Sequence, residues 1–304
     1  MWRRLFSRHR DGHRPLAAQA DATAARGDRL GREGRWQAAS AVTAEAVDMY
    51  RRLAATDDEA RGKLAGTLVS LGEWLARESR FPEAADADAE AVAILRELAP
   101  RSAQARRGLA AAVNNAGVHL GQANRWPAAV ELGRETVTLM RGLDEEQPGA
   151  FTAEVALAYL NLGTRLDALG LDQESLEAKR EAVARLTRLV QDDPALLPEL
   201  ARACTTLGPT AARLHLLDEA VAAAREAIRH YRALAAEEPR AHADGLAGNL
   251  ANLAMFLRDA GRRAEAYAAV DESITVYRSH PGMTSSDAAR LQHLLRLRAE
   301  LADF

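Results

Sequence analysis

The sequence contains few of the residues on which disulfides, β-sheets and membrane spans depend. Among its 304 residues there is one cysteine, Cys204, so neither an intrachain disulfide nor a thiolate metal cluster can form. Aromatic residues make up only 5% of the chain, whereas sheets favour aromatic and β-branched residues. No run of about 18 apolar residues occurs, so a transmembrane helix is not expected. We therefore expect an all-α protein of a reducing, cytoplasmic environment.

Signals for catalysis, metal binding and nucleic-acid binding are also scarce. The net charge of -3 argues against a general nucleic-acid binder, which usually carries a basic face. The HExxH, GxGxxG, P-loop and GxSxG patterns are missing, and the histidines, such as His119 with no acidic neighbour in sequence, are expected to be surface or packing residues. Cys204 is expected to be buried and inert. These observations predict a non-enzymatic protein with no metal and no cofactor.

What the sequence does contain is an internal repeat of 45 or 46 residues. Its phrase begins with a bulky residue, has a small residue three positions later and ends in Glu-small-aliphatic, as in FPEAADADAEAV from Phe81. The glutamates near the ends of the six copies are Glu45, Glu90, Glu135, Glu181, Glu226 and Glu272. A fixed period of this length indicates a stack of supersecondary units. We expect the glutamates to form salt bridges on the outer face of the stack.

Columns of small residues accompany each copy. Nine residues before the phrase lie Gly27, Gly72, Gly117, Gly163, Gly208 and finally Ala254, and six before it lie Leu30, Leu75, Leu120, Leu166, Ala211 and Leu257. Within the phrase, one small column is Ala39, Ala84, Ala129, Ser175, Ala220 and Ala266, and a second is Ala46, Ala91, Thr136, Ala182, Ala227 and Ser273. Each unit therefore predicts helix A, a short turn and helix B, with small residues where helices approach closely.

Prolines and capping residues mark the predicted boundaries. The gaps between units contain Pro100, Pro148, Pro194, Pro239 and Pro281, and proline ends one helix and is accepted at the start of the next. Asp193 is expected to cap the helix that begins at Pro194. Thr56 and Glu59 have the spacing of a capping box. Pro209 lies inside a predicted helix A, where we expect a static kink, with a hinge as the alternative.

These columns resemble the tetratricopeptide repeat, on the evidence of the glycine column, the leucine three residues later and the two small columns of helix B. The period exceeds that family's roughly 34 residues, and the longer unit is similar to kinesin light chains and to many bacterial regulatory proteins. The resemblance implies an all-α, right-handed superhelical solenoid of about six helix-turn-helix hairpins with a C-terminal capping helix. We expect a basic segment over 1–16, which is either ordered or disordered, a solenoid over 17–284 and a capping helix over 285–304. The expected units of the solenoid are 17–55, 56–100, 101–148, 149–193, 194–238 and 239–280.

The resemblance also implies a concave groove lined by helix A. The position two residues before the glycine column carries Ala25, Ser70, Asn115, Asn161, Thr206 and Asn252, and in kinesin-light-chain-type repeats an asparagine here holds the backbone of a bound peptide. An amide side chain both donates and accepts hydrogen bonds, so it can satisfy a peptide N–H and C=O together. The expected peptide-binding residues are Ser70, Asn114, Asn115, Asn161, Thr206 and Asn252, with Arg77, Arg213 and Arg258 for carboxylates. The alternatives are hydrogen bonds that brace adjacent A helices, or no role.

The N-terminal sequence MWRRLFSRHRDGHR stands apart from the repeats. It has five arginines and one aspartate, and a helix would place Trp2, Leu5 and Phe6 on one side. Such a segment is able to lie on an anionic membrane surface, to dock on another protein or in the chain's own groove, or to be a frayed start that adds solubility. It has no apolar run after its charges, so no secretory signal is expected.

The sequence thus predicts a non-enzymatic, bacterial-type protein-interaction module that holds an extended peptide or partner segment in its groove. The expected partner is a protein or peptide and not a nucleic acid. The alternative is a regulatory or scaffold subunit that acts through end-cap or convex-surface contacts, including as a homodimer. A third and less favoured class is a membrane-associated scaffold tethered by the arginine-rich start.

Overall fold

The computed structural model describes residues 2–55, 57–279 and 285–302, with side chains over 14–55, 57–279 and 289–302. Within the described ranges the chain forms thirteen α-helices, two short 3-10 segments and no β-strand. It divides into two compact units, Met1–Phe151 and Thr152–Phe304. The side chains of Trp2, Leu5 and Phe6 lie outside the described residues, so the predictions for that segment stay predictions.

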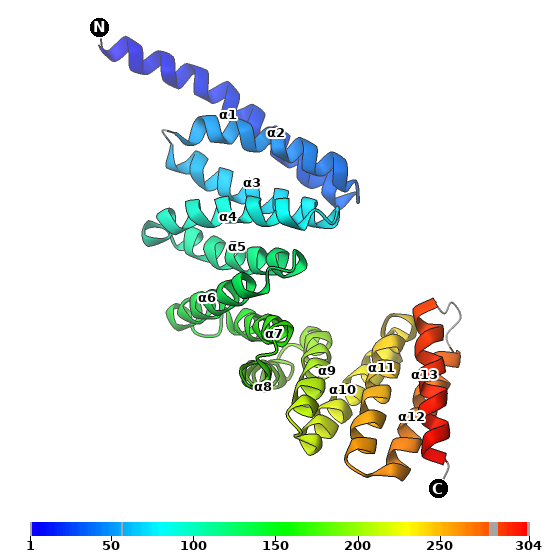
Figure 1. Ribbon diagram of the computed structural model, residues 1–304. Coiled ribbons are helices and arrows are strands. Elements are labelled where there is room, and N and C mark those ends of the chain that lie inside the picture. The colour runs from blue at the N-terminus through cyan, green and yellow to red at the C-terminus, as the bar shows by residue number, and fades with distance from the viewer. Residues whose placement is uncertain (1, 56, 280–284, 303–304) are drawn as a thin grey trace. The chain divides into compact units, whose positions relative to one another are not determined.

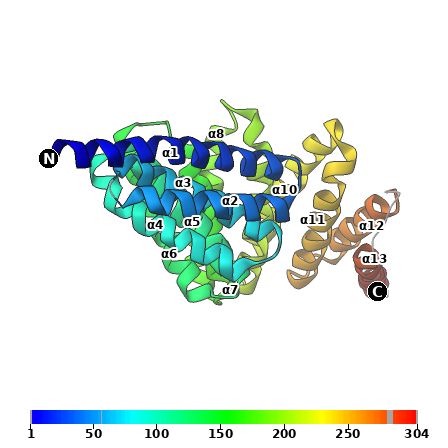
Figure 2. The same cartoon turned by 90° about the horizontal axis from the view of Figure 1, so that it is seen from above.

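Each unit is built from antiparallel helical hairpins in chain order (Figures 1 and 2). The first unit contains α1 (Trp2–Arg32), α2 (Trp36–Ala54), α3 (Asp58–Arg77), α4 (Phe81–Leu98), η1 (Ala99–Arg101), α5 (Ala103–Gln122) and α6 (Trp126–Glu146). The second contains α7 (Thr152–Ala168), α8 (Asp172–Leu189), η2 (Pro194–Leu196), α9 (Leu197–Arg213), α10 (Leu217–Glu237), α11 (Pro239–Asp259), α12 (Arg263–Ser279) and α13 (Ser285–Ala302). The odd-numbered helices α1 to α11 are the predicted A helices, and α13 closes the second unit.

The B helices begin where the repeat phrase begins. Their first residues are Trp36, Phe81, Trp126, Asp172, Leu217 and Arg263, one for each of the six copies. The prediction of six helix-turn-helix hairpins and a closing helix is therefore confirmed. The sequence and the structure agree on these helix starts because the repeat phrase begins where the turn between helix A and helix B ends.

One turn geometry joins helix A to helix B in all six hairpins. In each turn a single residue has a left-handed φ: Gly34, Ser79, Asn124, Gly170, His215 or Gly261. The residue after it donates its backbone N–H to the carbonyl of the leucine column, as Arg35 does to Leu30 at 3.0 Å. We call this the turn-closing position, and it is occupied by Arg35, Arg80, Arg125, Leu171, Leu216 and Arg262. Because the backbone makes the bond, the side chain at this position is not needed to form the turn.

The small-residue columns lie where the helices pack. All six members of the first column, from Ala39 to Ala266, are fully buried, and no member of the second is more than 1% exposed. The glycine column is just as closely packed. A Cβ atom at Gly72 would lie 2.7 Å from Oδ1 of Asp88 and 3.3 Å from the carbonyl oxygen of Ala84. The hairpin helices therefore approach closer than any larger side chain allows.

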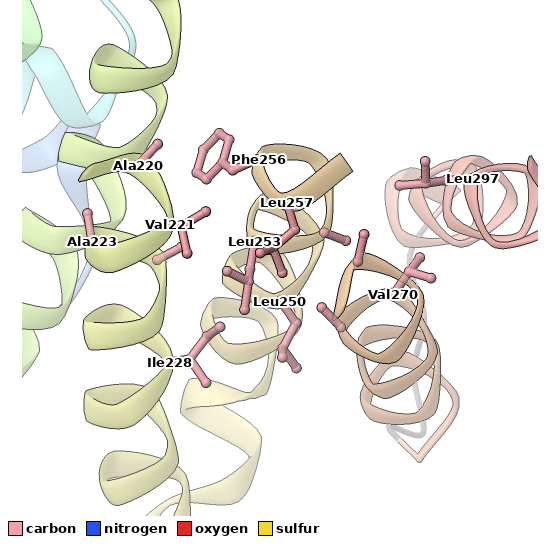
Figure 3. Close-up of a cluster of buried hydrophobic side chains, with 14 of the residues drawn as sticks. Ala220, Val221, Ala223, Ile228, Leu250, Leu253, Phe256, Leu257, Val270 and Leu297 are labelled. Atoms are coloured by element: carbon pink, nitrogen blue, oxygen red, sulfur yellow. The ribbon is translucent and has the colours of Figure 1, made fainter. Parts of the chain in front are cut away.

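Larger apolar side chains fill the remaining space, as Figure 3 shows for the second unit. Leu250, Leu253 and Leu257 of α11 are buried in one cluster with Val221 and Ile228 of α10. The same cluster extends to α12 and to the closing helix α13 through buried residues such as Val270, Leu294, Leu297 and Leu301. α13 thus covers apolar surface of the last hairpin, which is what a terminal element of a repeat stack has to do.

Within the described residues, five of the six glutamates of the repeat form ion pairs, and three of these pairs connect successive B helices. Glu90 pairs with Arg51 of the preceding helix B, Glu135 with Arg96, and Glu272 with Arg232, at N–O distances of 2.6–2.7 Å. Glu181 and Glu226 pair within their own helices, with Arg185 and Arg229. These side chains are partly or largely exposed, so each pair contributes about 0.2–1 kcal/mol.

The predicted caps are partly correct. Asp193 caps as predicted, since its carboxylate accepts the backbone N–H of Ala195, but Pro194 begins the 3-10 segment η2 and α9 starts only at Leu197. The cap of α3 is Asp57, whose carboxylate accepts the N–H of Glu59; Thr56 lies outside the described residues. α9 runs without interruption through Pro209, so the predicted kink does not divide the helix.

Two glycines of α3 provide a test of the close packing. Gly72→Ala is expected to destabilise the protein by about 1–3 kcal/mol, because the new methyl group meets Asp88 and the α4 backbone. Gly66 has no atom within 4 Å of a built Cβ, so Gly66→Ala is expected to stabilise by up to about 1 kcal/mol through helix propensity. Urea unfolding followed by circular dichroism measures both, and equal effects of the same sign would contradict the packing.

Candidate functional site

The second unit contains a cavity of about 630 Å³ between its A helices and α13. Its walls come mainly from α11 and α13, with single residues from α9, α10 and α12. The apolar part of the lining includes Tyr231, Ala251, Met255, Tyr277, Leu294 and Leu297, and the polar part includes Thr205, Asp244, Asn249, Asn252, Arg290 and His293. We call this cavity the concave pocket, because Asn252, one of the helix A residues predicted to face the groove, lines it.

A hydrogen-bonded brace holds one wall of the concave pocket. The amide nitrogen of Asn249 donates to the hydroxyl of Thr205 at 2.9 Å and to the carbonyl of Gly245 at 2.8 Å. The Thr205 hydroxyl in turn donates to the carbonyl of Ala201 at 2.9 Å. Asn249 is only 2% exposed, so these bonds satisfy a buried amide and tie α11 to α9. A brace between adjacent A helices is therefore present at Asn249, which is not one of the residues predicted from the sequence.

An aromatic ring forms part of the pocket's surface. Gly245 leaves room for Tyr231, since a Cβ at this glycine would lie 2.3 Å from Cε1 of the ring. The tyrosine ring of α10 is thereby in direct contact with the α11 backbone. Its other neighbour is His242, whose ring centroid lies 6.4 Å away. A flat aromatic face backed by a helix is a rigid apolar surface for a ligand side chain.

Charged groups stand at the pocket's edges. Asp244 of α11 is exposed, and Arg290 and His293 are exposed on α13. The two sides of the opening therefore differ in charge, with a carboxylate on one helix and cationic or titratable groups on the other. Such an arrangement is able to orient a bound chain that carries charge at both ends.

The predicted peptide-binding residues all lie on A helices, and they are divided between the two units. Ser70 and Arg77 are on α3, Asn114 and Asn115 on α5, Asn161 on α7, Thr206 and Arg213 on α9, and Asn252 and Arg258 on α11. Asn252 is the one that lines the concave pocket. Like Ser70 and Asn115, it is half-buried and its side chain makes no hydrogen bond within the described residues. Asn114 and Asn161 are each engaged in an interaction, and the Thr206 hydroxyl donates to Ala203 in its own helix.

The three predicted carboxylate-binding arginines have partners of their own. Arg213 donates to Asp172 at 2.8 Å and to Asp167 at 2.6 Å. Arg258 bonds the carboxylate of its neighbour Asp259. Arg77 is 3.7 Å from Glu73 and lies over the ring of Trp36, at 5.6 Å from the centroid. A ligand carboxylate would have to compete with these contacts.

Comparison with known proteins identifies the fold. No protein family model matches the sequence, and no curated protein matches it. Among solved structures, BtubC (BKLC) from P. vanneervenii gives a TM-score of 0.63 at 21% identity, over 82% of this chain and 95% of that one. A putative kinesin light chain with TPR-like repeats from Podosopora anserina gives 0.56 at 18% identity, over 71% and 95%. Aspartyl phosphate phosphatase F from Bacillus subtilis gives 0.60 at 12% identity, over 98% and 73%.

The chain has a tetratricopeptide-repeat-like fold. The likeness to a kinesin light chain with TPR-like repeats agrees with the long repeat unit found in the sequence. Sequence identities of this size establish the fold and not the ligand.

A buried polar network joins two tetratricopeptide-repeat-like hairpins of the second unit. Its residues were not predicted from the sequence. Lys179 of α8 is fully buried, and its ammonium group bonds Asp167, the hydroxyl of Thr210 at 2.7 Å and the carbonyl of Thr206 at 3.0 Å. The Ser175 hydroxyl lies 2.6 Å from Asp167. Burial opposes ionisation of Asp167, but the bonds from Lys179 and Ser175 outweigh it and lower the pKa of this carboxyl.

A second buried pair lies in the first unit and corrects the expectation for His119. Nδ1 of His119, on α5, is 2.6 Å from Oδ2 of Asp88, on α4. Asp88 is fully buried, and this desolvation raises its pKa against the opposing effect of His119. Asp88 and Lys179 occupy the same repeat position, with Thr43, Gly133, Ala224 and Val270 in the other copies. A charged residue in this otherwise uncharged column was the available sequence signal.

Cys204 is buried, as predicted. Its side chain lies in the core of the second unit with Leu160 and Leu186, and burial raises the pKa of its thiol to about 12. A thiol with this pKa is protonated at neutral pH and therefore a poor nucleophile. In the described part of the chain, no helix has the length and apolarity to cross a membrane.

Lys179 and its neighbour Arg180 allow the buried network to be tested. Lys179→Met is expected to destabilise the protein by about 1–3 kcal/mol, because the buried Thr210 hydroxyl and Asp167 lose a hydrogen-bond partner while Arg213 still pairs with Asp167. Arg180→Met removes the adjacent exposed pair with Glu219 and is expected to cost at most about 1 kcal/mol. Urea unfolding measures the change in the free energy of unfolding for each of the two variants.

Burial lowers the pKa of Lys179 from its ordinary value, and on the acid side the pH dependence of that difference is set by Asp167. Since its pKa is lower in the folded chain than the ordinary 3.8, the network's contribution is complete above pH 3.8 and is lost as the pH falls through the folded value. A Lys179→Met cost no larger than that of Arg180→Met at pH 7 would contradict the role given to the network.

Proposed function

We propose that this protein is a non-enzymatic, cytoplasmic protein-interaction module that binds an extended peptide or partner segment in the concave pocket. The single observation that carries the proposal is the position of Asn252. This asparagine lines a cavity of about 630 Å³, is half-buried and has no hydrogen bond to the described residues. Its amide is therefore free to donate to one peptide C=O and to accept from one peptide N–H.

The surroundings of Asn252 support a peptide ligand. Met255 lies one turn further along α11, and Tyr231, Leu294 and Leu297 supply apolar surface nearby. Met adapts to ligands of different shape, and a cavity that is mostly apolar with a few polar groups is the usual form of a binding site. We infer that an apolar side chain of the ligand enters the pocket while Asn252 holds the backbone beside it.

The opposite face of the same unit is a weaker candidate. A cavity of about 430 Å³ lies between α10, α11 and α12. The charged groups at its edge are already paired with each other, as Arg225 is with Glu265 and Arg232 with Glu272. A partner on this convex side would have to break these pairs, so the alternative of convex-surface binding is less favoured than the concave pocket.

The proposal is tested with peptides selected on the full-length protein from a random phage-displayed library. Asn252→Ala is expected to weaken the selected peptides about tenfold, which corresponds to the loss of about 1.4 kcal/mol of hydrogen bonding. Met255→Arg is expected to abolish binding, because it places a charge in the apolar part of the pocket. Fluorescence anisotropy with labelled peptide gives the affinities.

A matched control is Gln173→Ala on α8, where the side chain bonds Glu177 and does not line the pocket. This variant is expected to bind like the wild type. Peptides that bind Asn252→Ala and Met255→Arg with unchanged affinity would show that the concave pocket is not the binding site.

A further inference from the structure

Two neighbouring hairpins of the second unit have leucine at the turn-closing position, where the other four hairpins have arginine. In the first two hairpins the turn is edged by ion pairs, Glu33 with Arg35 and Glu78 with Arg80. At the same two repeat positions the fourth hairpin has Leu169 and Leu171, and the fifth has Leu214 and Leu216. The backbone of these turns is unchanged, since Leu171 and Leu216 close them with the same N–H bond as the arginines. The leucines are therefore not required by the fold.

Three of these four leucines are exposed, whereas Leu214 packs against the core of the second unit. Among the described side chains, four large hydrophobic residues are exposed, and three of them are Leu169 at 37%, Leu171 at 37% and Leu216 at 40%. The fourth, Val118, lies in the first unit. Single exposed apolar residues are common on protein surfaces, but three of them on two adjoining turns, where the other four turns have arginine, favour an interaction surface.

The two turns are held side by side by polar contacts beneath them. Arg213, which precedes Leu214, donates to Asp172, which follows Leu171. Arg213 also bonds Asp167, and Asp167 is anchored by the buried Lys179. We call the surface formed by Leu169, Leu171 and Leu216 the leucine platform. It is rigidly supported, as a binding surface needs to be.

The charge around the leucine platform is acidic. The segments 167–180 and 213–219 contain six acidic and three basic residues, a net charge of -3. Asp218 is exposed beside Leu217, and its charge acts on Arg262 of the next hairpin. A complementary ligand therefore combines large apolar side chains with positive charge.

The N-terminal segment of the chain has this chemistry. Residues 2–14 have five arginines and one aspartate, a net charge of +4, with Trp2, Leu5 and Phe6 spaced for one helical face. We propose that the leucine platform of one molecule binds residues 2–14 of a second copy. This self-association does not depend on the concave pocket and goes beyond the proposed peptide binding.

The proposed contact is head-to-tail, because it joins two different surfaces. Such a contact does not close after two copies unless the geometry forms a ring. We therefore expect the weight-average mass of the full-length protein to rise with concentration past twice 32.9 kDa, with a Kd of about 10 µM, as for a small transient interface. Raising the salt from about 0.05 M to 0.5 M is expected to weaken it, since the complementary charges are screened. Analytical ultracentrifugation measures both effects.

Two full-length variants separate the two halves of the contact. Leu171→Arg with Leu216→Arg restores the arginine found at Arg35, Arg80 and Arg125, so the fold is expected to be kept and the protein to be monomeric. Trp2→Ser, Leu5→Ser and Phe6→Ser together remove the apolar side chains of the segment and are also expected to give a monomer. A mixture of the two variants retains one intact platform and one intact segment, so it is expected to form a dimer and nothing larger.

Val118→Arg is the control, because it removes the exposed hydrophobic residue outside the platform, and it is expected to associate like the wild type. A wild-type protein that stays monomeric at about 100 µM, ten times the expected Kd, would overturn the proposal. Association that stops at a dimer and persists in the Leu171→Arg, Leu216→Arg variant would also overturn it. Loss of peptide binding in Asn252→Ala with unchanged self-association would separate this surface from the concave pocket.

Discussion

The close approach of helix backbones within each hairpin is the constraint on which the rest of the structure depends. The first small column is fully buried in all six copies, and the backbone at Gly72 passes too close to α4 for a Cβ atom. Helices at this distance leave little volume for side chains, so alanine takes the place of the aromatic residues that most cores use. The same closeness brings the A helices within hydrogen-bond reach of one another, and this is how Thr205 and Asn249 come to form one wall of the concave pocket.

Buried charges occur where this packing leaves a side chain facing the glycine column. Lys179 and Asp88 occupy that position in two hairpins, whereas Ala224 and Val270 occupy it in two others. Buried ion pairs offset their desolvation cost only with good geometry, and apolar residues at the same position are at least as stable. The polar members therefore specify which hairpins meet: Lys179 bonds α7 and α9, and Asp88 bonds α5. They restrict the order of the stack more than they raise its stability.

The first residue of each helix B could be predicted from the sequence, because the repeat phrase begins where that helix begins. The starts of the B helices, the turns and the small columns recur at a fixed spacing, and six copies average out local exceptions. The side-chain contacts were not predictable in the same way. Arg213 meets Asp167 across 46 residues of sequence, and Asn249 meets Thr205 across 44. Such pairs depend on the angle between neighbouring hairpins, which the period does not specify.

In the candidate site, too, the position of a residue was predictable from the sequence but its side-chain contacts were not. The position two residues before the glycine column does place Asn252 in the concave pocket, while the bracing amide is Asn249, three residues earlier. The most direct test of peptide binding in this pocket is hydrogen exchange of the full-length protein with and without a selected peptide. The account predicts slower exchange confined to α11, α13 and the adjoining part of α9. Slower exchange confined to α10 and α12, or to the first unit, would contradict it.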